Sequence, residues 1–510
     1  MKPPLSGLAM RRATATEKPV KPELPSCWVI GFSGHRDVAN PEQILEALAG
    51  ILKDLRHEVR GELIGYSSIA IGGDTLFARA CMSLGFPWIA VLPLPQIDFR
   101  NDFSAPEWKE AETLLGLAAQ VNTLHEAASR DEAYLECGLN TVDEADIVIA
   151  LWNGKPARGV GGTGDIVDYA RTLKKPLILI HPDTIEVRRE NFESGFADPD
   201  MDYLNSLQAG GSFTPKPELD SRENARALLE QFFHNVDDAA SRMAPRVRGW
   251  VAASVVMSAA AAILGAASVF FSLGSWIFIV LIIALTAGAI LAVLCLKWQG
   301  APQNWIRCRV AAEICRSVLV SWNLPRIAES VWADHDIPLV HRLIRSARAQ
   351  WLTPGLQSAP DFERCKADYL RDRVDDQIRY YRRRYAKLLP TQRKLSAIFW
   401  IFSGAALIRQ PVFTLLHSHW PGQRMPLLNY FFLVALPSVS ACSLSMMSVL
   451  DLNRQLARAR EMEGRLVAAR EQIENCHGMR SLERAVRRTE GILASEIFEW
   501  FTLYKNPRFN

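Results

Sequence analysis

The feature that most constrains this chain is a long stretch without any ionisable side chain. Residues 249–296 contain no Asp, Glu, Lys, Arg or His. A helix needs about 20 apolar residues to cross a hydrocarbon core of ~30 Å, so this stretch is long enough for two crossings. Turn-forming residues at 271–275 divide it into spans at about 250–271 and 276–296. The pattern predicts a helical hairpin within a membrane.

A second pair of apolar segments follows near the C-terminus. Residues 427–450 are uncharged and predict one span, but its partner has only residues 395–408 before Arg409 interrupts it. Two alternatives are open for this partner. It continues past Arg409 toward Leu416, with the arginine reaching the interface, or it is re-entrant.

Basic residues flank both predicted hairpins at their outer ends. They are Arg242, Arg246, Arg248, Lys297, Arg307 and Arg309 around the first, and Lys387, Arg393, Lys394, Arg454, Arg458 and Arg460 around the second. The positive-inside rule then places all these ends in the cytoplasm. We therefore expect a multi-pass protein of the inner (cytoplasmic) membrane with its N-terminal domain in the cytoplasm. A long polar helix is predicted after each hairpin, so the chain resembles two copies of one unit, although convergence on a common membrane pattern explains this too.

The N-terminal part has a different pattern. Between residues 27 and 183, short apolar runs alternate with amphipathic segments. Near-continuous apolar runs are typical of strands buried on both faces of a parallel sheet. The predicted strands are 27–31, 68–72, 88–92, 147–151 and 177–180, and the predicted helices are 42–59, 75–84, 106–118 and 166–173. This predicts an α/β doubly wound, Rossmann-like N-terminal domain, followed by an all-α transmembrane region of helical hairpins with long cytoplasmic helices.

These patterns divide the chain into seven parts. They are a disordered tail (1–25), the α/β domain (26–185), a linker and helix (186–245), a first hairpin with trailing helix (246–325), a cytoplasmic helical segment (326–390), a second hairpin with trailing helix (391–475) and a C-terminal helix (476–510). The tail has no apolar core, so no signal peptide is expected. The nine cysteines form no CxxC pair, which indicates a reducing compartment without a zinc site. A net charge of +3 over 510 residues gives no reason to expect nucleic acid as a partner.

Three glycine-bearing junctions between strands and helices are the candidate ligand site. Amides at a helix N-terminus attract anions, and glycines let a phosphate approach the backbone. The alternative for any one junction is that its glycines serve only the turn. The candidate ligand-binding residues are Gly31, Ser33, Gly34, His35 and Arg36 in the first junction, Gly72, Gly73 and Asp74 in the second, and Gly161, Gly162, Thr163 and Gly164 in the third. Asp74 is predicted either to contact a ribose hydroxyl or to cap its helix.

Together these motifs resemble the SLOG superfamily, Rossmann-like domains related to the Lonely Guy phosphoribohydrolases and to DprA and YpsA. The resemblance covers about residues 27–185 and implies nucleotide binding. The Lonely Guy signature Pro-Gly-Gly-x-Gly-Thr-x-x-Glu is matched here by residues 160–168, with Val160 for the proline, Asp165 for the threonine and Asp168 for the glutamate. Asp168 is therefore the candidate catalytic residue if the domain is a nucleotide N-glycosidase. No cofactor and no metal site are expected.

The combination of this domain with membrane hairpins is similar to the SLOG and SLATT associations of bacterial conflict systems. That resemblance implies a homo-oligomeric sensor-effector that binds a nucleotide or NAD-derived ligand and permeabilises the lipid bilayer. The alternatives are a membrane-bound hydrolase of the Lonely Guy type and an inert partner platform.

The basic segment before the second hairpin interleaves arginines with tyrosines. Its residues are Arg379, Tyr380, Tyr381, Arg382, Arg383, Arg384, Tyr385 and Lys387. Aromatic and basic side chains together suit nucleic acid, but a segment that leads into a membrane span more often meets anionic headgroups. We expect headgroup contact.

Overall fold

The structure is a computed structural model that describes residues 21–505, except for 60, 125–128, 158, 194, 209, 211, 217–218, 220, 272–275, 299–300, 325–330, 332–337, 350–360 and 420–424. Most of the predicted tail and the turn at 272–275 lie outside the described residues. The chain forms two compact units, one of residues 1–235 and 314–360 and the other of residues 236–313 and 361–510. We call them the α/β unit and the helical unit.

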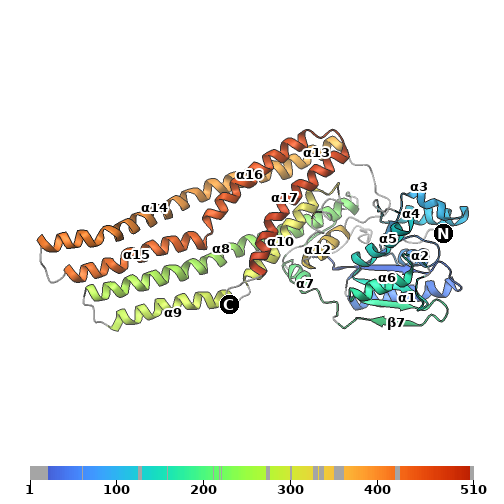
Figure 1. Ribbon diagram of the computed structural model, residues 1–510, viewed down its shortest axis with the longest axis horizontal. Coiled ribbons are helices and arrows are strands. Elements are labelled where there is room, and N and C mark those ends of the chain that lie inside the picture. Colours follow the sequence, from blue (N-terminus) through green and yellow to red (C-terminus); the bar gives the residue numbers. More distant parts are fainter. Residues whose placement is uncertain are drawn as a thin grey trace. The chain divides into compact units, whose positions relative to one another are not determined.

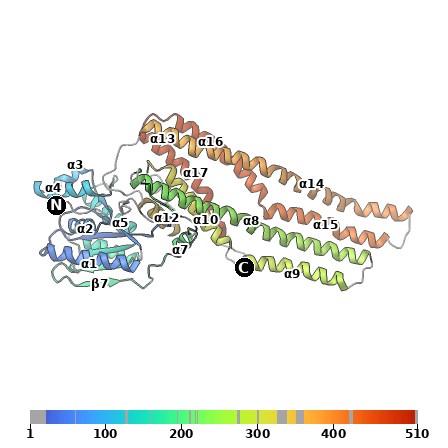
Figure 2. The ribbon, with the colours of Figure 1, turned by 180° about the vertical axis from the view of Figure 1, so that it is seen from behind.

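The α/β unit is built on a seven-stranded sheet (Figure 2). Its strands are β1 (Cys27–Gly34), β2 (Glu62–Ser67), β3 (Trp88–Leu92), β4 (Gln120–Thr123), β5 (Ile147–Leu151), β6 (Leu177–Ile180) and β7 (Val187–Glu190). Their order is β4-β3-β2-β1-β5-β6-β7, and only β7 is antiparallel to its neighbour. The chain moves outward from β1 to β4 and then returns to the other side of β1. The point of reversal therefore lies between β1 and β5, where open α/β sheets bind ligands.

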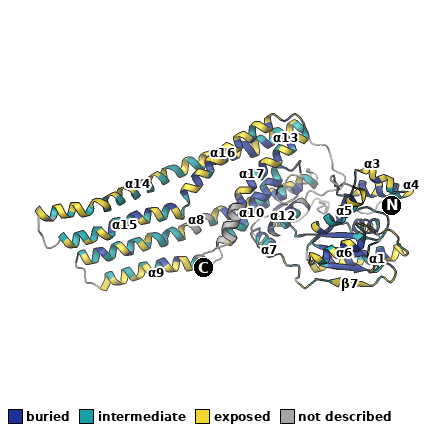
Figure 3. Cartoon of the chain, viewed as in Figure 1, coloured by how far each residue is buried: buried dark blue, intermediate teal, exposed yellow. Residues whose placement is uncertain are grey.

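Helices cover both faces of the sheet because its strands are apolar on both sides. In β1, Trp28, Ile30 and Phe32 join the core on one face, while Cys27 and Val29 join the core on the other. The strands β1, β2, β3, β5 and β6 are accordingly largely buried (Figure 3). The first face carries α1 (Pro41–Val59), α2 (Gly73–Ser83) and α4 (Ala105–Leu117), and the second carries α5 (Arg130–Glu144) and α6 (Thr163–Thr172). The short helices α3 (Gln96–Phe99) and α7 (Pro199–Ser206) complete this part.

One predicted strand is wrong. The second strand is β2 at Glu62–Ser67, and residues 68–72 form the loop that follows it. The apolar run at 68–72 predicted a strand, but Ile69 is buried as part of this loop. The sequence also gave no sign of β4, whose residues Gln-Val-Asn-Thr are largely polar, or of the exposed edge strand β7.

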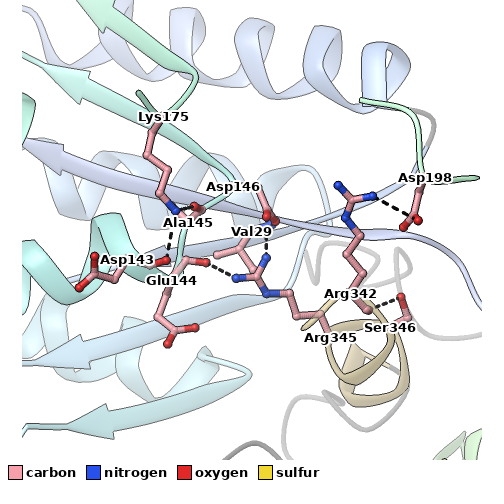
Figure 4. A network of polar contacts seen from close by, with 10 residues as sticks. All are labelled: Val29, Asp143, Glu144, Ala145, Asp146, Lys175, Asp198, Arg342, Arg345 and Ser346. Atoms are coloured by element: carbon pink, nitrogen blue, oxygen red, sulfur yellow. Dashed lines mark hydrogen bonds and ion pairs between the residues drawn. The ribbon is translucent and has the colours of Figure 1, made fainter. Parts of the chain in front are cut away.

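A helix from beyond the first hairpin belongs to the α/β unit. In α12 (Pro338–Ala349), the Arg345 guanidinium donates to the Asp146 carboxylate at 2.6 Å and to the Glu144 carbonyl at 2.7 Å (Figure 4). The other Asp146 oxygen accepts the Val29 amide at 2.9 Å. Arg342 of the same helix pairs with Asp198 at 3.2 Å. These bonds hold α12 at the amino end of β5. The glycine loops lie at the opposite, carboxyl ends of the strands.

The helical unit contains two antiparallel pairs of long helices (Figure 1). The first pair is α8 (Ser221–Phe270), whose first residues belong to the α/β unit, and α9 (Trp276–Trp298); the second is α14 (Asp376–His419) and α15 (Met425–Val449). Their continuations are α10 (Ala301–Val320), α13 (Phe362–Tyr369), a π-helical turn (Leu370–Asp375), α16 (Leu452–Glu474) and α17 (Met479–Lys505). Phe270 packs against Phe431 at 6.0 Å between ring centroids, which joins the two pairs.

Among the residues that the structure describes, four helices are long and apolar enough to cross a membrane, and their apolar windows are only 0–22% buried. Exposed apolar faces of this length fit a lipid environment better than water. Helix α14 continues past Arg409 to His419, and the Arg409 guanidinium donates to the Asn429 side chain on α15. This continuity favours the extended form of the third segment over a re-entrant one.

Candidate functional site at the β1–β5 switch point

The loops after β1 and β5 are bonded to each other where the strand order reverses. The His35 amide donates to the Leu151 carbonyl at 3.2 Å, and the Asn153 amide donates to Nε2 of His35 at 3.2 Å. Because Nε2 accepts a hydrogen bond, this geometry has the ring proton on Nδ1. His35 therefore joins two loops and keeps one ring N–H as a donor.

The loop after β2 closes against the same turn. The Gly73 amide donates to the His35 carbonyl at 3.0 Å. Gly72 has a φ of +90°, and a Cβ there would lie 2.2 Å from the Arg36 carbonyl oxygen. Gly34 and Gly73 also meet closely, since a Cβ on Gly73 would lie 3.0 Å from the Gly34 Cα. Only glycine permits this approach, which brings the N-terminus of α2 beside the first loop.

Asp74 lies in the first turn of α2 as a buried carboxyl, with 6% of its surface exposed. Its Oδ2 accepts the Ala70 amide at 3.3 Å, and its Oδ1 has no hydrogen-bond partner in the part of the chain that the structure describes. Burial raises the pKa of Asp74 to about 7, against the opposing effects of the nearby Ala70 and Gly34 backbone amides and of Arg36. Gly72, not Asp74, is the N-cap of α2. At neutral pH this carboxyl is thus partly protonated, and it has one free oxygen.

Arg36 supplies the positive charge of the site. Its guanidinium carbon lies 5.4 Å from the centroid of the Tyr134 ring, a cation–π arrangement. The Tyr134 hydroxyl donates to Asp102, which also pairs with Arg130, so the ring is fixed in place. Within the described residues, Arg36 has no ion pair of its own. The sequence did not point to Tyr134, Asp102 or Arg130 because the helix that carries two of them was not predicted.

The third junction folds mainly upon itself. Gly161 has a φ of +79°, and a Cβ there would lie 2.7 Å from the Leu135 amide nitrogen of α5. The Gly161 amide donates to the Asp165 carboxylate at 3.0 Å, so this amide is already engaged. A Cβ on Gly164 would lie 2.8 Å from the Ala157 nitrogen, and Thr163 is buried. These contacts give the glycines a packing reason, as they also do for Gly162, which faces Ala157.

The remaining predicted residues lie away from the loop contacts. A Cβ on Gly31 would lie 2.7 Å from the Ala145 Cβ, so this glycine lets β1 approach the end of α5. Ser33 pairs with Ala150 inside the sheet. The Asp168 side chain is 76% exposed on the outer side of α6 and lies 3.6 Å from Arg171. The loops therefore gather Gly34, His35, Arg36, Gly72, Gly73 and Asp74.

No protein-family model matches this chain, and no curated protein is significantly similar to it.

Proposed function

We propose that the α/β unit binds a phosphate-bearing ligand of the nucleotide class at the junction of the β1, β2 and β5 loops. One observation carries this proposal: three features lie at the same turn. They are the Arg36 side chain, the N-terminus of α2 and the Asp74 carboxyl, whose Oδ1 accepts no hydrogen bond from the described residues. Arg36 would pair with a phosphate, and the α2 amides would add donors. The free Asp74 oxygen would bond a ribose hydroxyl, as acceptor when ionised or as donor when protonated.

The helical unit supplies the second half of the proposed function. We place its four apolar helices in the inner membrane as two hairpins, with the N-terminal domain and the hairpin ends in the cytoplasm. The chain leaves the α/β unit within α8 and returns to it within α10, so the first hairpin is anchored in that unit at both ends. This connection supports a sensor-effector in which ligand binding drives membrane permeabilisation by a homo-oligomer. The resemblance to SLOG and SLATT proteins points the same way.

Calorimetric titration of the full-length protein in lipid nanodiscs tests the ligand site. The probes are NAD, cyclic ADP-ribose, cyclic dinucleotides and nucleoside monophosphates. We expect one of these to bind, and Arg36→Ala to weaken it by about tenfold or more. The matched control is Arg188→Ala, which removes an exposed arginine from β7. Equal binding by wild type and Arg36→Ala, or no binding by wild type to any probe, would contradict the proposal.

The raised pKa of Asp74 favours one second candidate, hydrolysis of a nucleotide N-glycosidic bond. A buried carboxyl that titrates near neutral pH suits general acid–base catalysis, whereas the exposed Asp168 has no such environment. The same titration samples, analysed for free base, distinguish enzyme from sensor. An enzyme would release base in wild type and lose this activity in Asp74→Asn, with Asp168→Asn as the test of the signature position.

A further inference from the structure

The helical unit contains a cavity of about 610 Å³ between its helices. This volume is within the range of roughly 300–1,000 Å³ that is usual for small-molecule sites. Its walls come from α8, α10, α14, α16 and α17, so five separate chain segments converge on it. A space of this size with partly polar walls needs an occupant or water.

The walls of this cavity are strongly cationic. Arg383, Arg384 and Lys387 line it together with Arg309, which pairs with the wall residue Glu313 at 2.8 Å and with Asp237 at 3.6 Å. The Arg384 guanidinium donates to the Tyr380 hydroxyl at 2.7 Å and to Gln455 at 3.0 Å, so neutral groups position it, and no carboxylate of the described residues forms an ion pair with it. Throughout the described ranges, Arg383 and Lys387 have no acidic partner. The cavity thus presents an excess of positive charge.

Arginines neutralise Glu313, the carboxylate that lines the cavity. Glu313 pairs with Arg309 at 2.8 Å and lies 3.6 Å from the buried Arg373, which also holds Glu490 through two bonds of 2.9 Å. Glu490 and Glu313 raise the pKa of Arg373 above its usual value despite the opposing effect of burial, so this guanidinium stays charged. Glu313 is therefore committed to arginines and does not repel an incoming anion.

The cavity lies a short distance from the apolar spans along each helix. Lys387 precedes the apolar run at Leu395 by eight residues, or about 12 Å along a helix. The headgroup layer extends roughly 5–8 Å from the hydrocarbon core, and long basic side chains reach across the remaining gap. Trp305 and Tyr380 add aromatic walls of the kind that favours this zone.

We propose that this cavity binds a phosphate-bearing anion, either the headgroup of an acidic phospholipid or a free phosphate compound. Arg383 and Lys387 would pair with the phosphate oxygens at the rim, and Arg384 would reach them from its place on Tyr380. The site belongs to the helical unit alone. It is separate from the proposed nucleotide site, and neither proposal depends on the other.

Two measurements on the full-length protein distinguish a phospholipid headgroup from a free phosphate compound as the ligand. Native mass spectrometry reports phosphatidic acid retained from mixed phosphatidylcholine nanodiscs, and calorimetry reports inorganic pyrophosphate binding in phosphatidylcholine alone. Arg383→Gln/Lys387→Gln is expected to weaken either the retention of phosphatidic acid or the binding of pyrophosphate by about thirtyfold. The matched control, Arg393→Gln/Lys394→Gln, removes two exposed charges on the same helix outside the cavity and is expected to stay within about threefold of wild type.

Loss of lipid retention alone identifies the headgroup as ligand, and loss of pyrophosphate binding alone identifies a free phosphate. Arg383→Lys/Lys387→Arg keeps the charges and is expected to bind, which separates a charge effect from misfolding. Arg188→Ala, which lies outside both proposed sites, is expected to leave this binding unchanged. Equal losses in the two glutamine variants, or no binding of either probe by wild type, would overturn the proposal.

Discussion

The Asn153 amide donates a hydrogen bond to Nε2 of His35, which joins the loops after β5 and β1 across the point where the strand order reverses. This bond fixes the tautomer of the histidine that directly precedes Arg36 in the chain. The imidazole therefore adds a side-chain link to the backbone bonds that join the loops of the proposed ligand site.

Removal of this imidazole is expected to loosen the site. His35→Ala leaves the Asn153 amide without its acceptor, which costs about 1 kcal/mol of the free energy of unfolding and about tenfold in ligand affinity. Calorimetry and thermal unfolding in nanodiscs measure the two effects. His181→Ala is the control, because Nδ1 of His181 likewise accepts backbone amides, from Asp183 and Thr184, but in the turn after β6. An equal loss of affinity in both variants would contradict the role of His35.

Two glycines with a positive φ test the close contact between the first two loops. Gly72 and Gly154 have φ values of +90° and +77°, but only at Gly72 would a Cβ meet another atom, the Arg36 carbonyl oxygen. Gly154→Ala is expected to cost about 1 kcal/mol for the left-handed conformation alone. Gly72→Ala is expected to cost at least twice as much and to abolish ligand binding, because the first loop must move. Equal thermal shifts in the two variants would show that the loops do not meet as described.

The buried carboxyl of Asp74 predicts a pH dependence with a definite sign. Its pKa rises from 3.8 to about 7 on folding, so between these values the folded state binds more protons than the unfolded state. The free energy of unfolding therefore falls as pH rises through this window, by up to about 4 kcal/mol. Asp74→Asn is expected to flatten this dependence and to be more stable than wild type at pH 8. Thermal unfolding at pH 5 and pH 8 measures it, and a stability that rises from pH 5 to pH 8 in wild type but not in the variant would contradict the assignment.

The buried pair of Arg373 and Glu490 is expected to be critical for the helical unit. Glu490→Gln leaves a buried guanidinium short of its partner, which costs about 3–5 kcal/mol in typical cases. The control is Glu463→Gln, which breaks the more exposed pair with Arg382 and is expected to cost less than about 1 kcal/mol. Unfolding of the detergent-solubilised protein reports both. Similar costs for the two substitutions would show that the buried pair contributes no more than a surface pair.

The strands that the sequence predicted well are those buried on both faces. Three runs, β3, β5 and β6, match their predicted bounds, and every residue in them is buried, as is typical of inner strands of a parallel sheet. β4 and β7 carry polar side chains and are strands only because a neighbouring strand pairs with them. Such pairing is a tertiary property, so local composition could not predict it.

The site was predictable in its first two loops and less so elsewhere. Glycines beside His35 and Arg36 marked a turn that the structure brings to the switch point, since the carboxyl ends of β1 and β2 are neighbours. The aromatic support from Tyr134 arrives from a distant helix and has no local signal. The third loop matched a phosphate-binding pattern, yet Asp165 accepts the Gly161 amide there. Glycines thus serve packing within the third loop, and a close approach of two loops at Gly72 and Gly73.

The most direct test of the central claim is dye release from liposomes that contain the full-length protein. The account predicts that the nucleotide identified by calorimetry releases dye from liposomes with wild-type protein and with Arg188→Ala, but not from those with Arg36→Ala. Binding of the nucleotide by wild type without release of dye would contradict the proposed coupling between the α/β unit and the membrane.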